Sequence, residues 1–380
     1  MLCGMRAVWF SLALPLMFSC RPLQAPVQDV QAVAPPPVVT PSAALPSFTR
    51  GINLGNALDA PSEGAWGVRL SEAHFAMAHA AGLDHVRLPV RFSAHAGANA
   101  PYTIDEAFFK RVDWAIDQAL NHGLAVIVDL HHYEELMKEP EANADRFVGL
   151  WSQIAARYKD RPASVAFELT NEPCDKLTPE LLNGVHSRAL KVVRASNPTR
   201  TVIVDSYFWA GADYLKQLDL PEDPNLVASF HMYQPILFTH QGAPWMNPEF
   251  QTSGIVFPGP PKEPVKPVPA AQSTDWVAKW FAGYNTQPVT TNPNGPQAIF
   301  DYFKTVEEYV ASTHRTVYLG EFGALDSADP KSRENWVHLV RTEAERRNIG
   351  WAYWDDGGRF KAMDVSHGSW LPNLKRALFD

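Results

Sequence analysis

Short runs of apolar and β-branched residues alternate with longer amphipathic stretches along most of this chain. Such alternation is typical of parallel strands that are joined by crossover helices. Eight such runs lie between residues 51 and 355. They predict strands over residues 51–55, 85–90, 124–131, 165–172, 201–206, 226–233, 316–323 and 350–355.

The stretches between these runs carry helix signals. Apolar positions with a helical period cover residues 105–121, just before Gly123, and residues 145–158. A third helix is predicted over residues 178–197, because Thr178-Pro179 can begin a helix and Pro198 ends one. Eight strand-helix units in one chain predict a single-domain α/β fold, the (β/α)8 TIM barrel. An open doubly wound sheet is the rival, but no glycine-rich phosphate-binding pattern follows the first strand.

One connection is longer than a barrel needs. Residues 234–295 follow the sixth strand and contain eleven prolines together with several aromatic residues, among them Trp245. Loops of this length are more often functional than idle. A poorly ordered insertion remains the alternative.

The first 46 residues do not resemble part of the barrel. In residues 1–20, Arg6 precedes an apolar run that is too short to span a bilayer, which indicates an export signal. Cys20 follows this run as in a bacterial lipoprotein site, so acylation and ordinary cleavage both remain open. Residues 21–46 contain seven prolines and predict an extended linker. The folded domain is then residues 47–380, exported and extracellular, periplasmic or lipid-anchored at the bacterial surface.

Charge and cysteine content narrow the classes of partner. The chain has 33 Lys and Arg against 41 Asp and Glu, for a formal charge of -8, and no basic run. A nucleic-acid or anionic-membrane partner is therefore disfavoured. An acylated Cys20 would leave Cys174 without a partner, so we expect no intramolecular disulfide. The 12 tryptophans offer flat faces on which a ligand can lie.

Polar side chains gather at the ends of the predicted strands. In a barrel these ends share one face, where active residues lie. Two of them, Glu172 and Glu321, form a pair that can cleave a glycosidic bond, one as proton donor and the other as nucleophile. Arg87 could keep one carboxylate ionised while the other retains its proton. One strand-end glutamate alone would indicate a structural ion pair, but two of them among so many polar strand ends favour catalysis.

The sequence blocks around these residues resemble glycoside hydrolase family 5, the cellulase and mannanase family. The resemblance covers most of residues 50–380. Its blocks are RGINLGN at 50–56, VRLPV at 86–90, DLHHYEEL at 129–136, TNEP at 170–173, FTHQGA at 238–243, LGEFG at 319–323 and WAYW at 351–354.

The resemblance implies roles for the catalytic pair and its neighbours. Glu172 matches the acid/base and Glu321 the nucleophile. Arg87 and Tyr233 would hold the nucleophile, and His231 would lie beside the acid/base. Since the family is retaining, the two carboxyl groups should lie about 5–5.5 Å apart.

The resemblance also implies contacts to the substrate. Asn171 would contact the 2-hydroxyl of the reacting sugar, and the same sugar would be surrounded by His131, His132 and Trp354. Asn56 and Asp59 would contact the next sugar on the non-reducing side. Trp245 would contact the sugar on the leaving-group side.

Other polar groups have competing interpretations. The pair His131 and His132 could indicate a metal-dependent hydrolase, but the first strand lacks the His-x-His pair usual in such barrels, so we expect no metal. Cys174 should be a bystander, because neighbouring carboxylates raise a thiol pKa. Glu134-Glu135 indicates a solvated turn. For Asp355-Asp356 a binding role and a loop role both remain open.

The sequence as a whole predicts a retaining endo-β-1,4-glucanase that needs no cofactor and acts as a monomer on a β-linked polysaccharide or oligosaccharide. β-1,4-Mannan is the alternative polymer. A barrel that binds polysaccharide without cleaving it is the alternative class, although such a surface would not need two glutamates.

Overall fold

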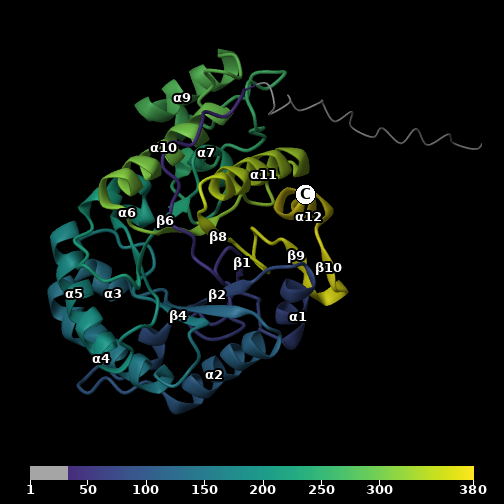
Figure 1. Ribbon diagram of the computed structural model, residues 1–380. Coiled ribbons are helices and arrows are strands. Elements are labelled where there is room, and N and C mark those ends of the chain that lie inside the picture. The colour runs from purple at the N-terminus through teal and green to yellow at the C-terminus, as the bar shows by residue number, and fades with distance from the viewer. Residues whose placement is uncertain (1–32) are drawn as a thin grey trace, which may run out of the picture.

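The computed structural model describes residues 33–380 as a closed barrel of eight parallel strands, with the helices outside it (Figure 1). Strand β1 pairs with both β2 and β8, which closes the barrel. This confirms the TIM barrel. The strands are β1 (Arg50–Asn53), β2 (His85–Val90), β3 (Ala125–Leu130), β4 (Val165–Glu168), β5 (Val202–Asp205), β6 (Leu226–Met232), β7 (Val317–Phe322) and β8 (Gly350–Tyr353).

Strand β4 is shorter than its prediction of 165–172. The ladder ends at Glu168, and Glu172 has a φ of 48°, which no strand can contain. The apolar run continues past Glu168 because the turn that follows is itself buried. The missing strand residues therefore form the turn that presents Glu172.

Long helices surround the barrel and confirm the three predicted ones. They are α1 (Glu72–Ala80), α2 (Glu106–Asn121), α4 (Pro140–Tyr158), α5 (Pro179–Ser196), α10 (Pro296–Thr313) and α11 (Pro330–Arg346), with α12 (Pro372–Phe379) at the end of the chain. Helix α4 begins five residues before its prediction, because Pro140 occupies the first turn, where a proline is tolerated. Short helices α3 (Glu134–Lys138) and α6 (Tyr207–Ala210) and the 3-10 turn η3 (Ala212–Gln217) lie in the loops after strands β3 and β5.

Apolar residues close the amino-terminal end of the barrel. Phe48 packs there against the inward side chains Ile127 and Ile203, among others. Gly350 lies directly beside this plug, where an added Cβ would come within 1.9 Å of the Phe48 carbonyl oxygen. Glycine is therefore required at the start of β8.

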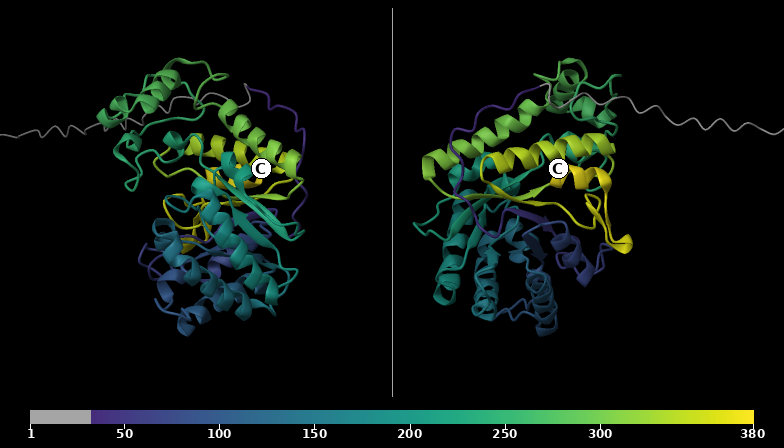
Figure 2. Two further views of the ribbon diagram at one scale, coloured as in Figure 1. Left: turned by 90° about the vertical axis from the view of Figure 1, so that its left-hand side faces the viewer. Right: turned by 45° about the vertical axis from the view of Figure 1, so that its right-hand side comes forward.

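Residues 33–46, which we call the N-terminal strap, contact the barrel although the sequence predicted a linker there. The backbone N–H of Ser42 donates to the Arg347 carbonyl at 2.8 Å, and the N–H of Val39 donates to Glu307 at 3.2 Å. The strap runs along the outside of the molecule past α10 (Figure 2). The part of the predicted linker that the structure describes, residues 33–46, is therefore packed on the barrel. The predicted export signal 1–20 and Cys20 lie outside the described residues.

The long connection after β6 has its own structure. It contains α7 (Ile236–Thr239), the 3-10 turn η4 (Pro248–Phe250), α8 (Pro269–Ser273) and α9 (Asp275–Thr286). Phe238 and Phe257 are buried in it with ring centroids 5.6 Å apart, and Trp336 of α11 donates to the Gln234 carbonyl. The insertion is thus packed on the barrel, with α9 at its outer edge (Figure 2). Among residues 33–380, no helix is both long and apolar enough to cross a membrane.

Candidate active site

Arg87, in the middle of β2, organises the polar groups inside the barrel. Its fully buried guanidinium forms two bonds of 2.8 Å to the Glu168 carboxylate and lies 3.0 Å from Asp129. It also donates to Asn53 at 2.8 Å and to Asn171 at 2.7 Å. A buried guanidinium needs this density of acceptors, because removing its charge from water is otherwise too costly. The arginine is therefore fixed in position.

Glu321, near the end of β7, receives two hydrogen bonds from this framework. The Arg87 guanidinium donates to Oε1 at 2.8 Å, and the Tyr233 hydroxyl donates to Oε2 at 2.8 Å. Burial raises the pKa of Glu321, while His231 and Arg87 oppose that rise. Both carboxylate oxygens are thus held in one orientation by groups that favour the ionised form.

Glu172 occupies the turn after β4 and has different surroundings. Its backbone N–H donates to Asp205 at 3.0 Å, and its carboxyl Oε1 lies 3.0 Å from His231 Nδ1. The side chain is 26% exposed, whereas that of Glu321 is 5% exposed. Burial of the carboxyl group raises the pKa of Glu172 to about 7, and Arg87 opposes this only in part. Glu172 can therefore carry a proton near neutral pH.

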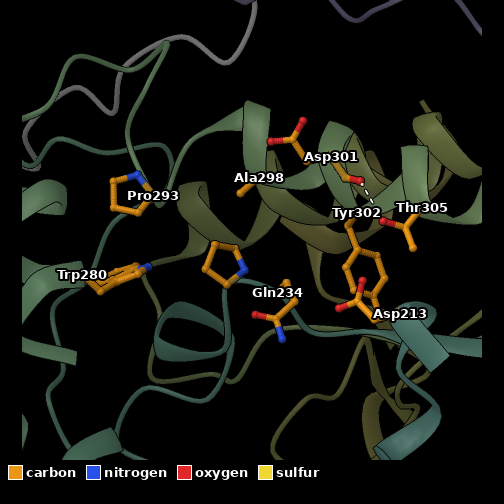
Figure 3. A pocket seen from close by; sticks show the side chains of 9 residues that line it. Asp213, Gln234, Trp280, Pro293, Ala298, Asp301, Tyr302 and Thr305 are labelled. Carbon is orange, nitrogen blue, oxygen red and sulfur yellow. Dashed lines mark hydrogen bonds between the residues drawn. The ribbon is translucent and has the colours of Figure 1, made fainter. Parts of the chain in front are cut away.

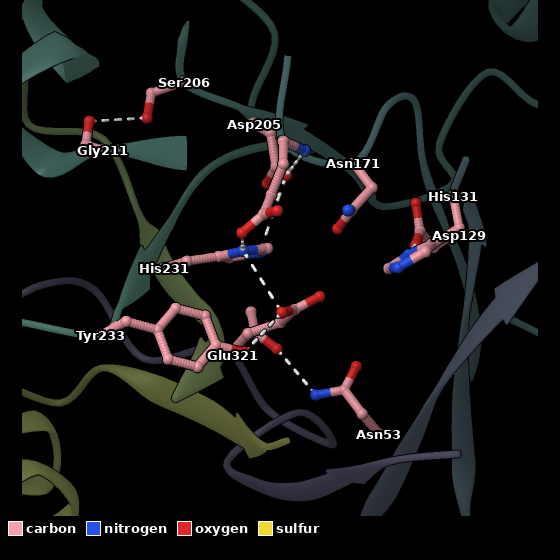
Figure 4. A network of polar contacts seen from close by, with 12 residues as sticks. Asn53, Asp129, His131, Asn171, Asp205, Ser206, Gly211, His231, Tyr233 and Glu321 are labelled. Atoms are coloured by element: carbon pink, nitrogen blue, oxygen red, sulfur yellow. Dashed lines mark hydrogen bonds and ion pairs between the residues drawn. The ribbon is translucent and has the colours of Figure 1, made fainter. Parts of the chain in front are cut away.

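The two glutamates face each other across His231. One oxygen of each and one ring nitrogen of His231 all lie within 4.8 Å of one another. Figure 4 shows His231 between Asp205 and Glu321, with Asn171 and His131 on the opposite side of the opening. A protonated carboxyl group and an ionised one, placed this close, can supply a proton and a nucleophile to a single bond.

A wall of rings lies beside the pair. His131 stacks parallel to Trp354 with centroids 5.5 Å apart, and its Nδ1 lies 2.5 Å from Asp129. Burial lowers the pKa of His131 far below its usual value and that of His132 to about 4. Both imidazoles are therefore neutral at pH 7 and suit contacts to sugar rings and hydroxyl groups.

Asn56 and Asp59, which the sequence assigned to the next sugar, differ in exposure. Asp59 is buried, and its carboxylate accepts the backbone N–H groups of Asn56 and Ala57, so it holds the loop together from behind. Asn56 is partly exposed and donates its side-chain amide to Asp355. Asp355 and Asp356 are themselves buried, and Asp355 accepts the backbone N–H of Gly358, so Asp355 helps to hold the loop after β8 together.

Residues 49–359 match the family model described as Cellulase (glycosyl hydrolase family 5). The chain belongs to glycoside hydrolase family 5. It is 32% identical to Endoglucanase H of Acetivibrio thermocellus over 322 residues, a match that covers 85% of this chain and 31% of that relative. The chain thus spans about a third of the length of this relative.

Solved structures of endoglucanase Cel5A from Thermotoga maritima are also similar. One is 39% identical to this chain, with a TM-score of 0.74 over 87% of this chain and 97% of its own. Two others, both 38% identical with a TM-score of 0.74, are complexes with mannotriose and with cellobiose. They cover the same shares of each chain.

In this family 5 hydrolase Trp245, the predicted contact on the leaving-group side, is largely exposed. It lies in the insertion after β6 and is 56% exposed, and the Arg359 guanidinium lies 5.9 Å from its ring centroid. Its ring is therefore free to contact a ligand.

Sequence reasoning missed several residues of this site. Trp66 is 44% exposed and meets His132 edge to face with ring centroids 5.5 Å apart. Trp209 is 50% exposed beside the turn that carries Glu172, where its backbone N–H donates to the Pro173 carbonyl. Asp205, which holds the turn of Glu172, was also missed. The aromatic run Tyr207-Phe208-Trp209, directly after a strand, was the available signal for Trp209.

Residues set aside from the sequence remain outside the reaction. Burial, helped by Asp175 and Glu172, raises the pKa of the Cys174 thiol to about 12. The thiol therefore stays protonated and is a poor nucleophile. Glu134 and Glu135 begin helix α3, so the interpretation as a turn is wrong, because the short helix already starts at Glu134. The solvent exposure is confirmed, since Glu134 is 46% exposed and pairs with Arg91 at 2.6 Å.

Three groups of donors in the described residues have the spacing of metal ligands. They are Asp59 with His131 and His132, Glu168 with Asp205 and His231, and Glu172 with His231 and Glu321. Each group contains a carboxylate that already accepts hydrogen bonds from the protein. The third is also next to the Arg87 guanidinium, which would repel a cation.

Proposed function

We propose that this family 5 hydrolase is a retaining endo-β-1,4-glucanase. The observation that carries the proposal is the close, unequal carboxyl pair, with a Glu172 oxygen within 4.8 Å of a Glu321 oxygen. Such proximity leaves no room for a water molecule to attack directly, which favours double displacement.

In the proposed first step, Glu172 gives its proton to the glycosidic oxygen while Glu321 attacks the anomeric carbon. The bond to the leaving sugar breaks and a glycosyl ester on Glu321 forms. In the second step, Glu172 removes a proton from water, and the water oxygen attacks the same carbon and releases Glu321 as a carboxylate. Arg87 and Tyr233 stabilise the charge on Glu321 that reappears there.

The substrate assignment has weaker support than the chemistry. Endoglucanase H and Cel5A are similar to this chain, and their names favour a glucan. The mannotriose complex of Cel5A keeps β-1,4-mannan as the second candidate. Asn171, whose carbonyl oxygen accepts from Arg87, is proposed to donate its free amide to the 2-hydroxyl of the reacting sugar. That hydroxyl is where glucose and mannose differ.

The test compares the protein with Glu321→Gln and Glu172→Gln on carboxymethylcellulose, barley β-glucan, mannan and an aryl cellobioside. We expect Glu321→Gln to abolish turnover on all four, because no covalent intermediate can form. Glu172→Gln should harm the polymers far more than the aryl substrate, whose leaving group needs little protonation.

The anomer released first, followed by NMR, checks retention. Inversion, or near-normal rates with Glu321→Gln, would contradict the mechanism. Polymer binding without release of reducing sugar would instead favour the non-catalytic barrel.

A further inference from the structure

An open pocket lies on the flank of the barrel, and neither glutamate of the carboxyl pair lines it. Its volume is about 430 Å³, within the range of roughly 300–1,000 Å³ typical of small-molecule sites. It opens between η3, α9 and α10, and none of the residues assigned to the reaction lines it. Figure 3 shows Trp280 and Pro293 at one end and Asp213 and Thr305 at the other. We call it the flank pocket.

Trp280 gives the flank pocket a fixed aromatic surface. Its ring is stacked on Tyr284, with centroids 5.0 Å apart and planes 17° apart. Tyr284 is itself buried, and its hydroxyl accepts the backbone N–H of Val256 at 2.8 Å. The indole therefore does not have to be ordered when a ligand binds, which lowers the entropic cost of binding.

The polar groups of the flank pocket have unused hydrogen-bonding capacity. Among residues 33–380, the exposed carboxylate of Asp213 has no hydrogen bond or ion pair, and the Gln234 side chain uses only its oxygen. One oxygen of Asp301 accepts from Gln297 at 2.9 Å, and the other has no partner in the described part of the chain. Two carboxylates that accept and one amide that donates match the hydroxyl groups of a sugar, and the indole matches its apolar face.

One wall of the flank pocket is attached to the catalytic strand. The Tyr302 hydroxyl accepts the N–H of Ala212 at 3.0 Å and donates to the carbonyl of His231 at 2.6 Å. Gln234 follows directly after Tyr233, which binds Glu321. A chain held in this pocket would therefore lie beside the end of β6, where His231 and Tyr233 contact the two glutamates.

We propose that the flank pocket binds a segment of β-linked glycan outside the catalytic centre and holds the polymer on the enzyme. The proposal rests on the proposed function for the class of ligand only. A neutral glycan is favoured over a cation because the apolar indole and two prolines line the pocket together with the polar groups.

The experiment measures retardation of the full chain in native gels that contain soluble hydroxyethylcellulose or glucomannan. The Glu321→Gln background prevents hydrolysis. Adding Trp280→Ala should raise the dissociation constant obtained from the retardation about tenfold, as expected for loss of a stacking ring and its buried contacts. Asp213→Ala, at an exposed position that should not disturb folding, should weaken it severalfold. Trp276→Ala is the matched control, because Trp276 is on the same helix, is 50% exposed and does not line the pocket.

Equal retardation for all three variants would overturn the proposal. So would loss of retardation in 0.5 M NaCl, because salt screens a charge-based site and leaves stacking intact. Hydrolysis of the aryl cellobioside by the unaltered chain is measured separately. If it is absent while Trp280→Ala still weakens retardation, the proposed function fails and the glycan site stands.

Discussion

The two glutamates differ in what surrounds each carboxyl group. Glu321 accepts from a guanidinium and a phenol, whereas the carboxyl of Glu172 faces His231 and is more open to solvent. The same residue type can thus act as nucleophile in one place and as acid in the other. This difference supports the proposal that Glu172 is the acid/base and Glu321 the nucleophile.

The pKa of Glu172 predicts the alkaline side of the pH profile. Glu172 must hold a proton to act as the acid, and burial raises its pKa to about 7. We therefore expect kcat/KM on polymer to fall as the pH rises through about 7. The decline of activity on the acid side should follow protonation of Glu321. Burial raises the pKa of Glu321, so this decline should begin at a higher pH than for an ordinary glutamate.

An aryl cellobioside measured over the same pH range is the control. Its leaving group needs little protonation, so its alkaline decline should be weaker. The same decline for both substrates would contradict Glu172 as the acid.

Some residues of the site cannot be assigned before the barrel closes. Glu168 looks like one polar residue in an apolar run, and only the closed barrel places it against Arg87. Glu172 and Glu321 could be proposed from the sequence because characteristic neighbours surround them there. Trp66 has no such neighbours, and its contact with His132 comes from two distant loops.

At the scale of elements, the insertion after β6 predicts a specific role for Trp245. Trp245→Ala should lower kcat/KM on polymers and longer oligosaccharides about fivefold, corresponding to roughly 1 kcal/mol of lost stacking. The aryl cellobioside should be affected much less, because its leaving group does not reach the platform. Steady-state kinetics on a chain-length series would measure this.

Trp276→Ala serves as the control here too, since both rings are about half exposed in the same insertion. Equal losses on polymer and aryl substrate after Trp245→Ala would show that the ring supports the fold.

The N-terminal strap predicts an effect on stability. The Ser42 hydroxyl accepts the buried backbone N–H of Val317, where β7 begins, at 3.1 Å. Ser42→Ala leaves that N–H without a partner and should lower the free energy of unfolding by about 1–3 kcal/mol. Urea denaturation measures the change. The exposed Ser47, which directly follows the strap, provides the control, Ser47→Ala, and an equal effect of both substitutions would contradict the contact.

Considered as a whole, the barrel was predictable and its additions were not. Each strand is an apolar run, and the residues of that run alone indicate where the strand begins. The strap and the insertion are rich in proline, which predicts extended chain, and their contacts to α10 and α11 come from residues far away in the sequence.

Exhaustive chelation should leave the activity of the whole enzyme unchanged. Each group of possible metal ligands contains a carboxylate that already accepts hydrogen bonds from Arg87, Tyr233 or backbone N–H groups, and two carboxyl groups suffice for the proposed chemistry. Activity assayed after dialysis against EDTA tests this. Loss of turnover that zinc alone restores would contradict the mechanism.

The group of carboxyl groups around Arg87 also has a consequence for inhibition. A single guanidinium faces three carboxyl groups, those of Asp129, Glu168 and Glu321, so carboxyl groups outnumber positive charge around Arg87. A neutral sugar ring gains little from this excess, but the positive charge that develops on the ring during cleavage is attracted to it. A sugar mimic with a protonated ring nitrogen carries that charge permanently. It should therefore bind more tightly than its oxygen analogue.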